Sequence, residues 1–454
     1  MPLNEQGGLE RMIPVHTSTQ EVPLPFKGSF PLAGRNKASI WPYVNRLLLF
    51  CIFSIIFRQT VLVRQRVTTV DFSAVDTYAY WDIVAVCLAA LVLIFSGSLF
   101  RTWSALRRTT AVWLIVYYLV CAASFIWSLA PAYSLYRSIE YLVLFFATYT
   151  VVAQYQDFAE AERAFLRVVA ATILLEMCVN LRLAGFSLLS LQAWHANTYS
   201  ASSAILFCYC LGEYLAMTKS ERSEAKKRSR RLRLFGIFSF GTLALGTSAT
   251  SNVAVAVGCC LIFLALRRFG LLLAALFVGL LLAILGGGEE LVRHLLFPGK
   301  TEKEIETAHG RTLIWKLYWH KFLQSPILGY GFGIISGGRD KALAALSHNS
   351  LFTVLIGTGS VGLMMFGLFA ARLWQSTLGK IWRRGPGMVG FVGALAATFV
   401  NSMGIPLLAD RWLTSSVVFV WLLGLFFIHV LNPQQVNRSS KRILPGKVIP
   451  GRRN

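Results

Sequence analysis

Charged residues are scarce in this sequence: they form 14% of its 454 residues, against roughly 25% in soluble globular proteins. Apolar residues form 55%, and apolar runs of about 20 residues, long enough to cross a bilayer, recur throughout. The period-two alternation of short barrel strands is missing. These features exclude a soluble protein and predict an all-α polytopic membrane protein.

Acidic residues are especially few, because 44 lysines and arginines face only 21 aspartates and glutamates, which gives a net charge of +23. The densest basic block lies between two apolar runs and contains Lys219, Arg222, Lys226, Lys227, Arg228, Arg230, Arg231 and Arg233. Because the block has no interleaved aromatic residues that could stack on bases, nucleic acid is not an expected partner. A basic block of this kind is typical of a cytoplasmic loop in a membrane protein, where it also attracts anionic membrane lipids.

Motifs for cofactors, metals and serine hydrolases are missing as well. Gly299–Lys300–Thr301 looks like the end of a P-loop, but His294 occupies the position of its first glycine. There is no His-Glu-x-x-His, no Asp-x-Asp and no Gly-x-Ser-x-Gly sequence. The cysteines lie within apolar runs, with no spacing typical of a metal site or a disulfide framework. We therefore expect neither a metal nor a cofactor.

The apolar runs predict about twelve membrane-spanning helices. The predicted spans are residues 40–57, 81–98, 110–128, 136–154, 164–181, 198–217, 234–248, 252–266, 268–286, 349–371, 387–404 and 412–431.

Alternating these spans from a cytoplasmic N-terminus places most basic loops on the cytoplasmic side of the membrane. The exception is loop 58–80, which contains three arginines but is predicted to lie outside. The predicted organisation is a cytoplasmic tail (1–39), nine spans (40–286), an outer loop (287–348), three spans (349–431) and a basic cytoplasmic tail (432–454). Because nucleotide sugars and ATP are absent from the outer face, a group transferred there has to arrive already activated, for example on a lipid.

Within the outer loop, residues 311–324 predict an amphipathic helix. Polar residues recur every fourth position and form one ridge, made of Thr312, Lys316, His320 and Gln324. Apolar residues, including two tryptophans, cover the other faces, which suits a helix lying at the membrane interface or against the bundle. Pro326 and Gly329 are expected to end the helix.

Arg311 and His348 are the candidate catalytic residues of this loop. Arg311 stands at the start of the predicted helix, where a guanidinium beside free N–H groups can bind phosphate or diphosphate, although it could also reach lipid headgroups. His348 and Asn349 stand at the entrance to the tenth span. An imidazole there could accept a proton from an attacking hydroxyl, and a His–Asn turn could equally cap the following helix.

Ionisable residues inside the spans are costly and are usually paired or functional. Arg137 and Glu140 lie three residues apart in the fourth span, so their side chains are expected to face each other. Glu176, Arg182, His195, Asp410 and Arg411 also map to the outer side, which favours one common cavity. Glu213, near the inner end of the sixth span, is expected to reach towards solvent.

The loop resembles the signature of the O-antigen ligase and polysaccharide polymerase superfamily. The matching residues are Gly310–Arg311–Thr312 with Trp315, Pro326 with Leu328–Gly329–Tyr330–Gly331–Phe332–Gly333, His348–Asn349 followed by Gly357 and Gly359–Ser360–Val361–Gly362–Leu363, and the earlier Ser128–Leu129–Ala130–Pro131 with Ser134–Leu135 and Arg137–Ser138.

The resemblance implies a bacterial inner-membrane glycosyltransferase with a helical fold of the GT-C type. Such an enzyme works at the periplasmic face, without a metal, on a glycan carried by undecaprenyl pyrophosphate. By this match, Arg311 would bind the diphosphate, and His348 would act as the general base or orient the acceptor. Glu140, Glu176 and Asn349 are then candidate substrate-binding residues.

The chain departs from the family pattern at the turn between the seventh and eighth spans. The family usually has an arginine or lysine in a serine-rich motif there, where this chain has Ser251. Either a second phosphate-binding cation comes from elsewhere, with Arg137, Arg182 and Arg411 as candidates, or this chain handles its substrate differently or has reduced activity.

Three functions remain possible on the sequence. The glycine-rich stretch 329–338 favours a polymerase that joins lipid-linked repeat units of an exported polysaccharide. A ligase that moves the glycan onto a lipid A-core acceptor is the second possibility. A secondary transporter is the third, although transporters usually contain paired broken helices and internal repeats, which the sequence does not indicate.

Overall fold

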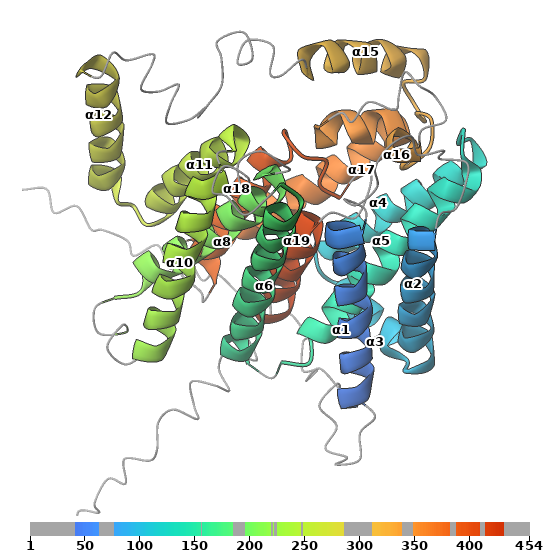
Figure 1. Ribbon diagram of the computed structural model, residues 1–454, viewed down its shortest axis with the longest axis horizontal. Coiled ribbons are helices and arrows are strands. Elements are labelled where there is room, and N and C mark those ends of the chain that lie inside the picture. The colour runs from blue at the N-terminus through green and yellow to red at the C-terminus, as the bar shows by residue number, and fades with distance from the viewer. Residues whose placement is uncertain are drawn as a thin grey trace, which may run out of the picture.

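A computed structural model gives the fold of the chain (Figure 1). It describes residues 41–62, 77–155, 157–184, 196–218, 221, 225–246, 248–285, 311–337, 348–381, 387–408 and 414–430. Every regular element in these ranges is a helix, as expected for an all-α protein.

Each predicted span overlaps one helix of the structure. These helices are α1 (Trp41–Phe57), α2 (Thr77–Phe95), α4 (Ala111–Ala123), α5 (Pro131–Val152), α6 (Phe158–Ala184), α8 (Ala196–Ala216), α10 (Lys226–Gly246), α11 (Ala249–Ala265), α12 (Phe269–Leu285), α17 (Ser350–Ile381), α18 (Met388–Asn401) and α19 (Thr414–Leu425). By length and hydropathy, three helices of the described ranges can cross a membrane alone, namely α5, α6 and α17, or four if α2 and α3 form one bent span. The protein is therefore a membrane protein, and the number of its spans stays a prediction.

Shorter elements connect these helices or extend their ends. They are η2 (Arg58–Leu62), α3 (Ser98–Leu106), η4 (Ser124–Ile126), α15 (Arg311–Gln324), α16 (Ile334–Gly337) and η5 (Phe426–Val430). Between α2 and α3 the chain bends by 82° at Gly97, whose φ of 67° is a conformation that glycine adopts without strain.

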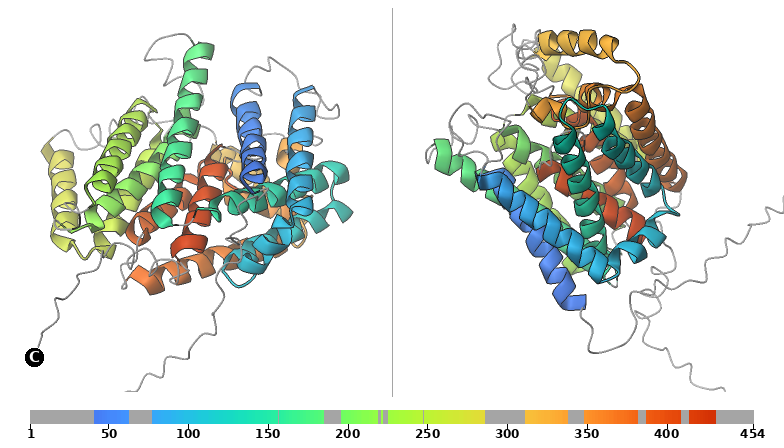
Figure 2. Two further views of the ribbon diagram at one scale, coloured as in Figure 1. Left: turned by 90° about the horizontal axis from the view of Figure 1, so that it is seen from below. Right: turned by 90° about the vertical axis from the view of Figure 1, so that its right-hand side faces the viewer.

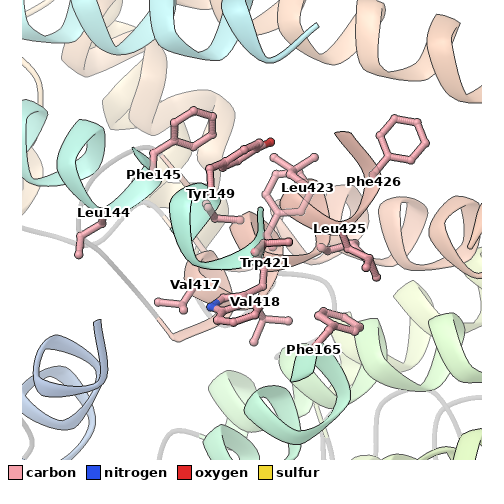
Figure 3. Close-up of a cluster of buried hydrophobic side chains, with 14 of the residues drawn as sticks. Leu144, Phe145, Tyr149, Phe165, Val417, Val418, Trp421, Leu423, Leu425 and Phe426 are labelled. Carbon is pink, nitrogen blue, oxygen red and sulfur yellow. The ribbon is translucent and has the colours of Figure 1, made fainter. Parts of the chain in front are cut away.

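The core of the bundle surrounds α19. Every residue from Thr414 to Leu425 is buried, which explains why this helix is apolar on all sides. Figure 3 shows Trp421 of α19 among side chains of α5 and α6, such as Tyr149 and Phe165. Because lipid is as apolar as these side chains, close packing rather than transfer out of water holds the helices together.

Helix α8 packs closely against several neighbours because small residues line its surface. A Cβ added to Gly212 would lie 2.7 Å from the Cα of Gly390 in α18, and one added to Gly258 of α11 would lie 2.6 Å from the Sγ of Cys208. Small residues at such crossings let helix backbones approach each other, as is common in membrane proteins.

Helix α15 lies across the bundle rather than along it. In Figure 1 it runs horizontally above α16 and α17, whereas α1, α2, α6 and α10 run close to vertical. Figure 2 shows α12 at the edge of the bundle, where it packs against α11. The side of the bundle that carries α15 is called the α15 end below, and the other side the opposite end.

Candidate functional site

The glycine-rich segment after α15 is held against a break in α17. Helix α17 is interrupted at Gly359, where φ is 63° and ψ is −158°. The backbone N–H groups of Ser360 and Val361 donate to the carbonyl oxygens of Pro326 and Ile327, over 2.8 and 3.2 Å. The polar groups that the break leaves without helical partners are thus satisfied within the protein, as a membrane environment requires.

The contact continues on the other side of the break. Here Tyr330 N donates to Ile356 O and Gly331 N donates to Gly357 O, both over 2.8 Å. A Cβ on residue 359 would lie 2.2 Å from Ile327 O, so only glycine fits at this crossing. The sequence does not indicate this break, but a break in α17 is not by itself the pair of broken helices that is usual in a transporter.

The connection between α4 and α5 joins the same assembly. Trp127 Nε1 donates to Leu328 O over 2.8 Å, and Leu129 N donates to Tyr330 O over 3.1 Å. A Cβ on Gly331 would lie 2.0 Å from the Oγ of Ser128. Three separate parts of the sequence signature therefore contact one another and form a scaffold.

Helix α15 begins and ends where the sequence predicts, at Arg311 and Gln324. It buries Tyr318 and Phe322 in a small apolar cluster with Ile334, Ile335 and Ile356. The predicted polar ridge points away from this cluster, and its members Lys316, His320 and Gln324 are exposed. The helix therefore rests on α16 and α17 through its apolar face.

Helices α15 and α17 run in the same direction, which brings Arg311 and His348 to the same end of the pair. The ring of Trp315 stacks on Phe352, with centroids 6.0 Å apart. Further along, Pro326 contacts Ser360. Arg311 is the first residue of α15, four residues before Trp315, and His348 lies just before the start of α17, four residues before Phe352.

Arg311 is a half-buried cation at the N-terminus of α15, and no carboxylate of the described residues forms an ion pair with it. Burial lowers the pKa of its guanidinium, because the charged form loses water without gaining an acidic neighbour. The first N–H groups of a helix carry a partial positive charge at the same place. This arrangement favours the binding of an anion.

Asn349 is the N-cap of α17. Capping of this helix is one of the two roles that the sequence leaves open for the His–Asn turn. Its Oδ1 accepts from Leu351 N over 2.9 Å, and its Nδ2 lies 3.8 Å from the Sδ of Met403. His348 precedes this cap with a φ of 48°, and its side chain is half-buried. The cap thereby fixes the backbone from which the imidazole projects.

Arg137 and Glu140 face each other as predicted, with Arg137 NH1 2.6 Å from Glu140 Oε2. Two residues that sequence analysis did not include extend this pair: Asp82 of α2 lies 3.9 Å from Arg137 and 2.6 Å from Arg58. Tyr133 accepts from Arg137 Nε over 3.0 Å. A single acid inside an apolar run, preceded by an arginine at the end of the previous run, was the available signal for this pairing.

These contacts neutralise Arg137 and disfavour it as a second phosphate-binding cation. Arg182, in the last turn of α6, is exposed and lacks an ion pair with any described residue. Arg411 lies outside the described residues, as do His195 and Asp410. Of the three arginines predicted to supply the second phosphate-binding cation, Arg182 is the described one whose charge is not used in an ion pair with a described residue.

Glu176 and Ser251 are both buried at the α15 end of the bundle. Thr414 of α19 donates to Glu176 Oε1, which links the last turns of α6 to the first turn of α19. Ser251 donates to Asn401 Oδ1 over 2.9 Å, so it has a partner within the bundle. At the position where the family usually has a cation, this chain has a contact between α11 and α18.

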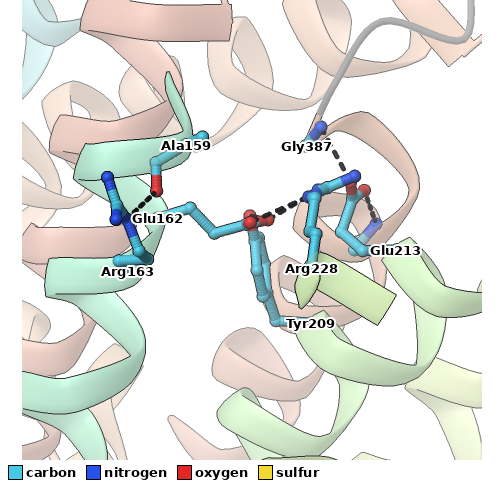
Figure 4. A network of polar contacts seen from close by, with 8 residues as sticks. Ala159, Glu162, Arg163, Tyr209, Glu213, Arg228 and Gly387 are labelled. Carbon is cyan, nitrogen blue, oxygen red and sulfur yellow. Dashed lines mark hydrogen bonds and ion pairs between the residues drawn. The ribbon is translucent and has the colours of Figure 1, made fainter. Parts of the chain in front are cut away.

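Glu213 does not reach towards solvent, which corrects the expectation from the sequence. Its carboxylate is buried at the opposite end of the bundle, 2.7 Å from Arg228 NH2, and accepts from the N–H groups of Gly387 and Gly390 (Figure 4). Arg228 also binds Glu162 through Nε and NH2, over 2.8 and 2.6 Å. Sequence position alone places Glu213 near an end of its helix but does not reveal its partners, which are Arg228 of α10 and the N–H groups at the start of α18.

A comparison with known families identifies a match in the central and C-terminal part of the chain. Residues 234–367 match the O-antigen ligase family. This match confirms the resemblance to the O-antigen ligase and polysaccharide polymerase superfamily, and it includes Arg311, His348 and the Gly359 break. A search of curated proteins finds no match to the chain. The O-antigen ligase match indicates ligase-type or polymerase-type activity at a membrane, with a lipid-linked glycan and an acceptor as the general classes of partner.

Proposed function

We propose that the protein is a glycosyltransferase of the inner membrane that joins repeat units carried on undecaprenyl pyrophosphate at the periplasmic face. The observation that carries this proposal is Arg311, a half-buried guanidinium at a helix N-terminus with no ion pair to a described carboxylate. Partial burial of a cation is costly because it removes water from the charge, and a diphosphate would relieve that cost when it binds. The O-antigen ligase match over the same region supports a lipid-linked glycan as its source.

In the proposed reaction, a hydroxyl of the acceptor glycan attacks the anomeric carbon of the donor. The new glycosidic C–O bond forms as the bond between that carbon and the diphosphate oxygen breaks. The imidazole of His348 takes the hydroxyl proton, and Arg311 stabilises the negative charge that develops on the departing diphosphate. The parallel packing of α15 and α17 supports this division of roles, because it puts both residues at one end of the pair.

The cap at Asn349 supports the role of His348 as a positioned base. A general base has to lie within hydrogen-bond reach of the proton that it removes, so its backbone must be held in place. Asn349 holds the first turn of α17 through Leu351 N, and Ser350 N donates to Ser402 O over 2.8 Å. The first turn of α17 is therefore tied to the end of α18.

The experiment uses the purified protein in vesicles with a lipid-linked repeat unit as the sole substrate. We expect the wild-type protein to lengthen the lipid-linked glycan, and we expect Arg311→Ala and His348→Ala each to slow this reaction by about 10²-fold or more. Arg372→Ala and His320→Ala are matched controls, because both side chains are exposed and lie elsewhere on α17 and α15.

The products separate the proposed activity from its alternatives. Lengthening of the glycan without any lipid A-core supports the polymerase. Transfer that occurs only after lipid A-core is added identifies a ligase instead. If Arg311→Ala and His348→Ala behave like their controls, the assignment of both residues is wrong.

A further inference from the structure

An exposed apolar surface on the α15 end has no role in the proposed reaction. It is formed by the second half of α15, by the residues that follow it and by the connection between α4 and α5. Its members are Trp319, Leu323, Ile327, Leu328, Ile126 and Leu129, and they are called the apolar patch below. Ile126 is 72% exposed, Ile327 65% and Leu323 57%.

The patch is continuous because hydrogen bonds hold its parts together. Trp127 Nε1 donates to Leu328 O, and Leu129 N donates to Tyr330 O. These contacts place residues 126–129 beside residues 327–330, although they are far apart in the sequence. Contiguous apolar surfaces of this kind mark sites of contact with another protein or with a membrane.

The charge around the patch distinguishes between these two kinds of partner. Residues 311–337 and 124–139 contain no aspartate or glutamate, whereas α15 contains Arg311, Lys316 and Lys321. A basic surface without acids is complementary to the phosphates of lipid headgroups. Trp319 and Trp127, whose rings combine an apolar body with an N–H group, are residues that membrane interfaces favour.

The orientation of α15 points to the same partner. The helix lies across the direction of α1, α2, α6 and α10, so all of its residues stand at a similar depth along the bundle (Figure 1). Its ridge of Lys316, His320 and Gln324 is exposed on one side, and Trp319 and Leu323 lie beside that ridge. A helix with this arrangement can lie in the plane of a membrane interface, with its polar ridge in water.

We propose that the apolar patch is seated in the lipid leaflet at the α15 end, at the boundary between headgroups and acyl chains. The lysines of α15 then face lipid phosphates, and α15 is anchored at that depth from its C-terminal half. This inference does not depend on the proposed reaction. If both hold, the anchor also keeps Arg311 near the depth at which a lipid diphosphate reaches the protein.

The test measures the depth of spin labels on the full-length protein in vesicles of phosphatidylcholine and phosphatidylglycerol. Labels are introduced by Leu323→Cys and Ile126→Cys in the patch and by His320→Cys on the polar ridge, after the exposed Cys87 and Cys178 have been replaced by serine. We expect the two patch labels to collide several-fold more with oxygen, which dissolves in lipid, than with a water-soluble nickel chelate. The label at residue 320 should show the opposite preference.

Two outcomes would overturn the proposal. Patch labels that are as accessible to the nickel chelate as the label at residue 320 would place the patch in water. Patch labels shielded from both reagents would show that a protein covers the patch instead. Because all three positions are exposed, folding is checked by the retention of the wild-type thermal transition. Leu328→Cys replaces a patch variant that loses it, and Lys316→Cys replaces the ridge variant.

Discussion

Arg228 and Arg311 are both partly buried arginines, but their surroundings differ completely. Arg228 lies at the opposite end of the bundle, between Glu162 and Glu213, and donates through Nε and NH2. Arg311 lies at the α15 end and has no ion pair with a described carboxylate. The first arginine completes an internal network, whereas the second forms no ion pair with any carboxylate of the described residues.

The difference in partners separates a partly buried arginine with a structural role from one with a binding role. In the Arg228 network, every carboxylate oxygen of Glu162 and Glu213 accepts at least one hydrogen bond, from Arg228, Tyr209 or the N–H groups that begin α18. Such completeness favours a structural role, because no oxygen of either carboxylate is left without a partner. An uncompensated cation at a helix N-terminus favours a binding role.

Removal of the Arg228 side chain should have the largest effect on stability. Arg228→Met leaves two buried carboxylates without their shared cation, so we expect a loss of about 3–5 kcal/mol in the free energy of unfolding. The measurement is thermal or denaturant unfolding of the purified protein in detergent. Arg230→Met, two residues away and exposed, is the matched control and should change stability by less than about 0.5 kcal/mol. Equal stability of the two variants would show that the network contributes nothing.

Arg311 should show the reverse pattern, with little effect on stability and a large effect on anion binding. We expect inorganic diphosphate to raise the thermal transition of the wild-type protein, by an amount that corresponds to about 2.7 kcal/mol at a concentration of about a hundred times Kd. In Arg311→Ala this shift should vanish, while the transition without diphosphate stays within a degree or two of wild type. Arg372→Ala should keep the full shift. A shift that survives in Arg311→Ala would remove the main support for the diphosphate site.

The sequence predicts features that depend on local spacing. The bounds of α15 follow from the four-residue polar repeat and from Pro326, and the pairing of Arg137 with Glu140 follows from their separation by one helical turn. Each predicted span overlaps a helix, because apolar runs of that length have few alternatives in lipid. Features that depend on neighbours far along the chain were missed or misjudged. Glu213 is the main example, because the N–H groups that bind it belong to α18.

The glycine motif shows the same limit in another form. Sequence similarity picks out Gly329, Gly331 and Gly359, but it does not give their conformation or their contacts. In the structure all three have positive φ values, and Gly329 and Gly359 cross each other's backbone. The candidate site is therefore only partly visible in the sequence: Arg311 and His348 are recognised, and the scaffold that holds α15 against α17 is not.

Gly359 and Gly367 offer a smaller test of that scaffold within one helix. Gly359→Ala forces a Cβ to within 2.2 Å of Ile327 O in a left-handed conformation, so we expect a loss of at least about 1–3 kcal/mol in stability. A Cβ on Gly367 meets nothing within 4 Å, so Gly367→Ala should leave stability unchanged or raise it by up to about 1 kcal/mol. Opposite signs in the unfolding experiment support the crossing at residue 359. A loss of equal size in both variants would mean that any added side chain destabilises α17, whether or not it meets the backbone of Ile327.

Asn349 should give the smallest effect, and it separates a capping role from direct substrate binding. Asn349→Ala removes the acceptor for Leu351 N, so we expect a loss of about 1 kcal/mol in stability and a fall in glycan transfer because the first turn of α17 frays around His348. Asn349→Asp and Asn349→Ser retain a side-chain oxygen that can accept from the same N–H group, so both should recover most of the stability and of the transfer rate. The measurements are unfolding in detergent and glycan lengthening in vesicles. If all three variants lose transfer equally while Asn349→Asp and Asn349→Ser regain stability, the amide itself contacts the substrate. The proposed substrate-binding surface at the α15 end would then include Asn349 as well as Arg311.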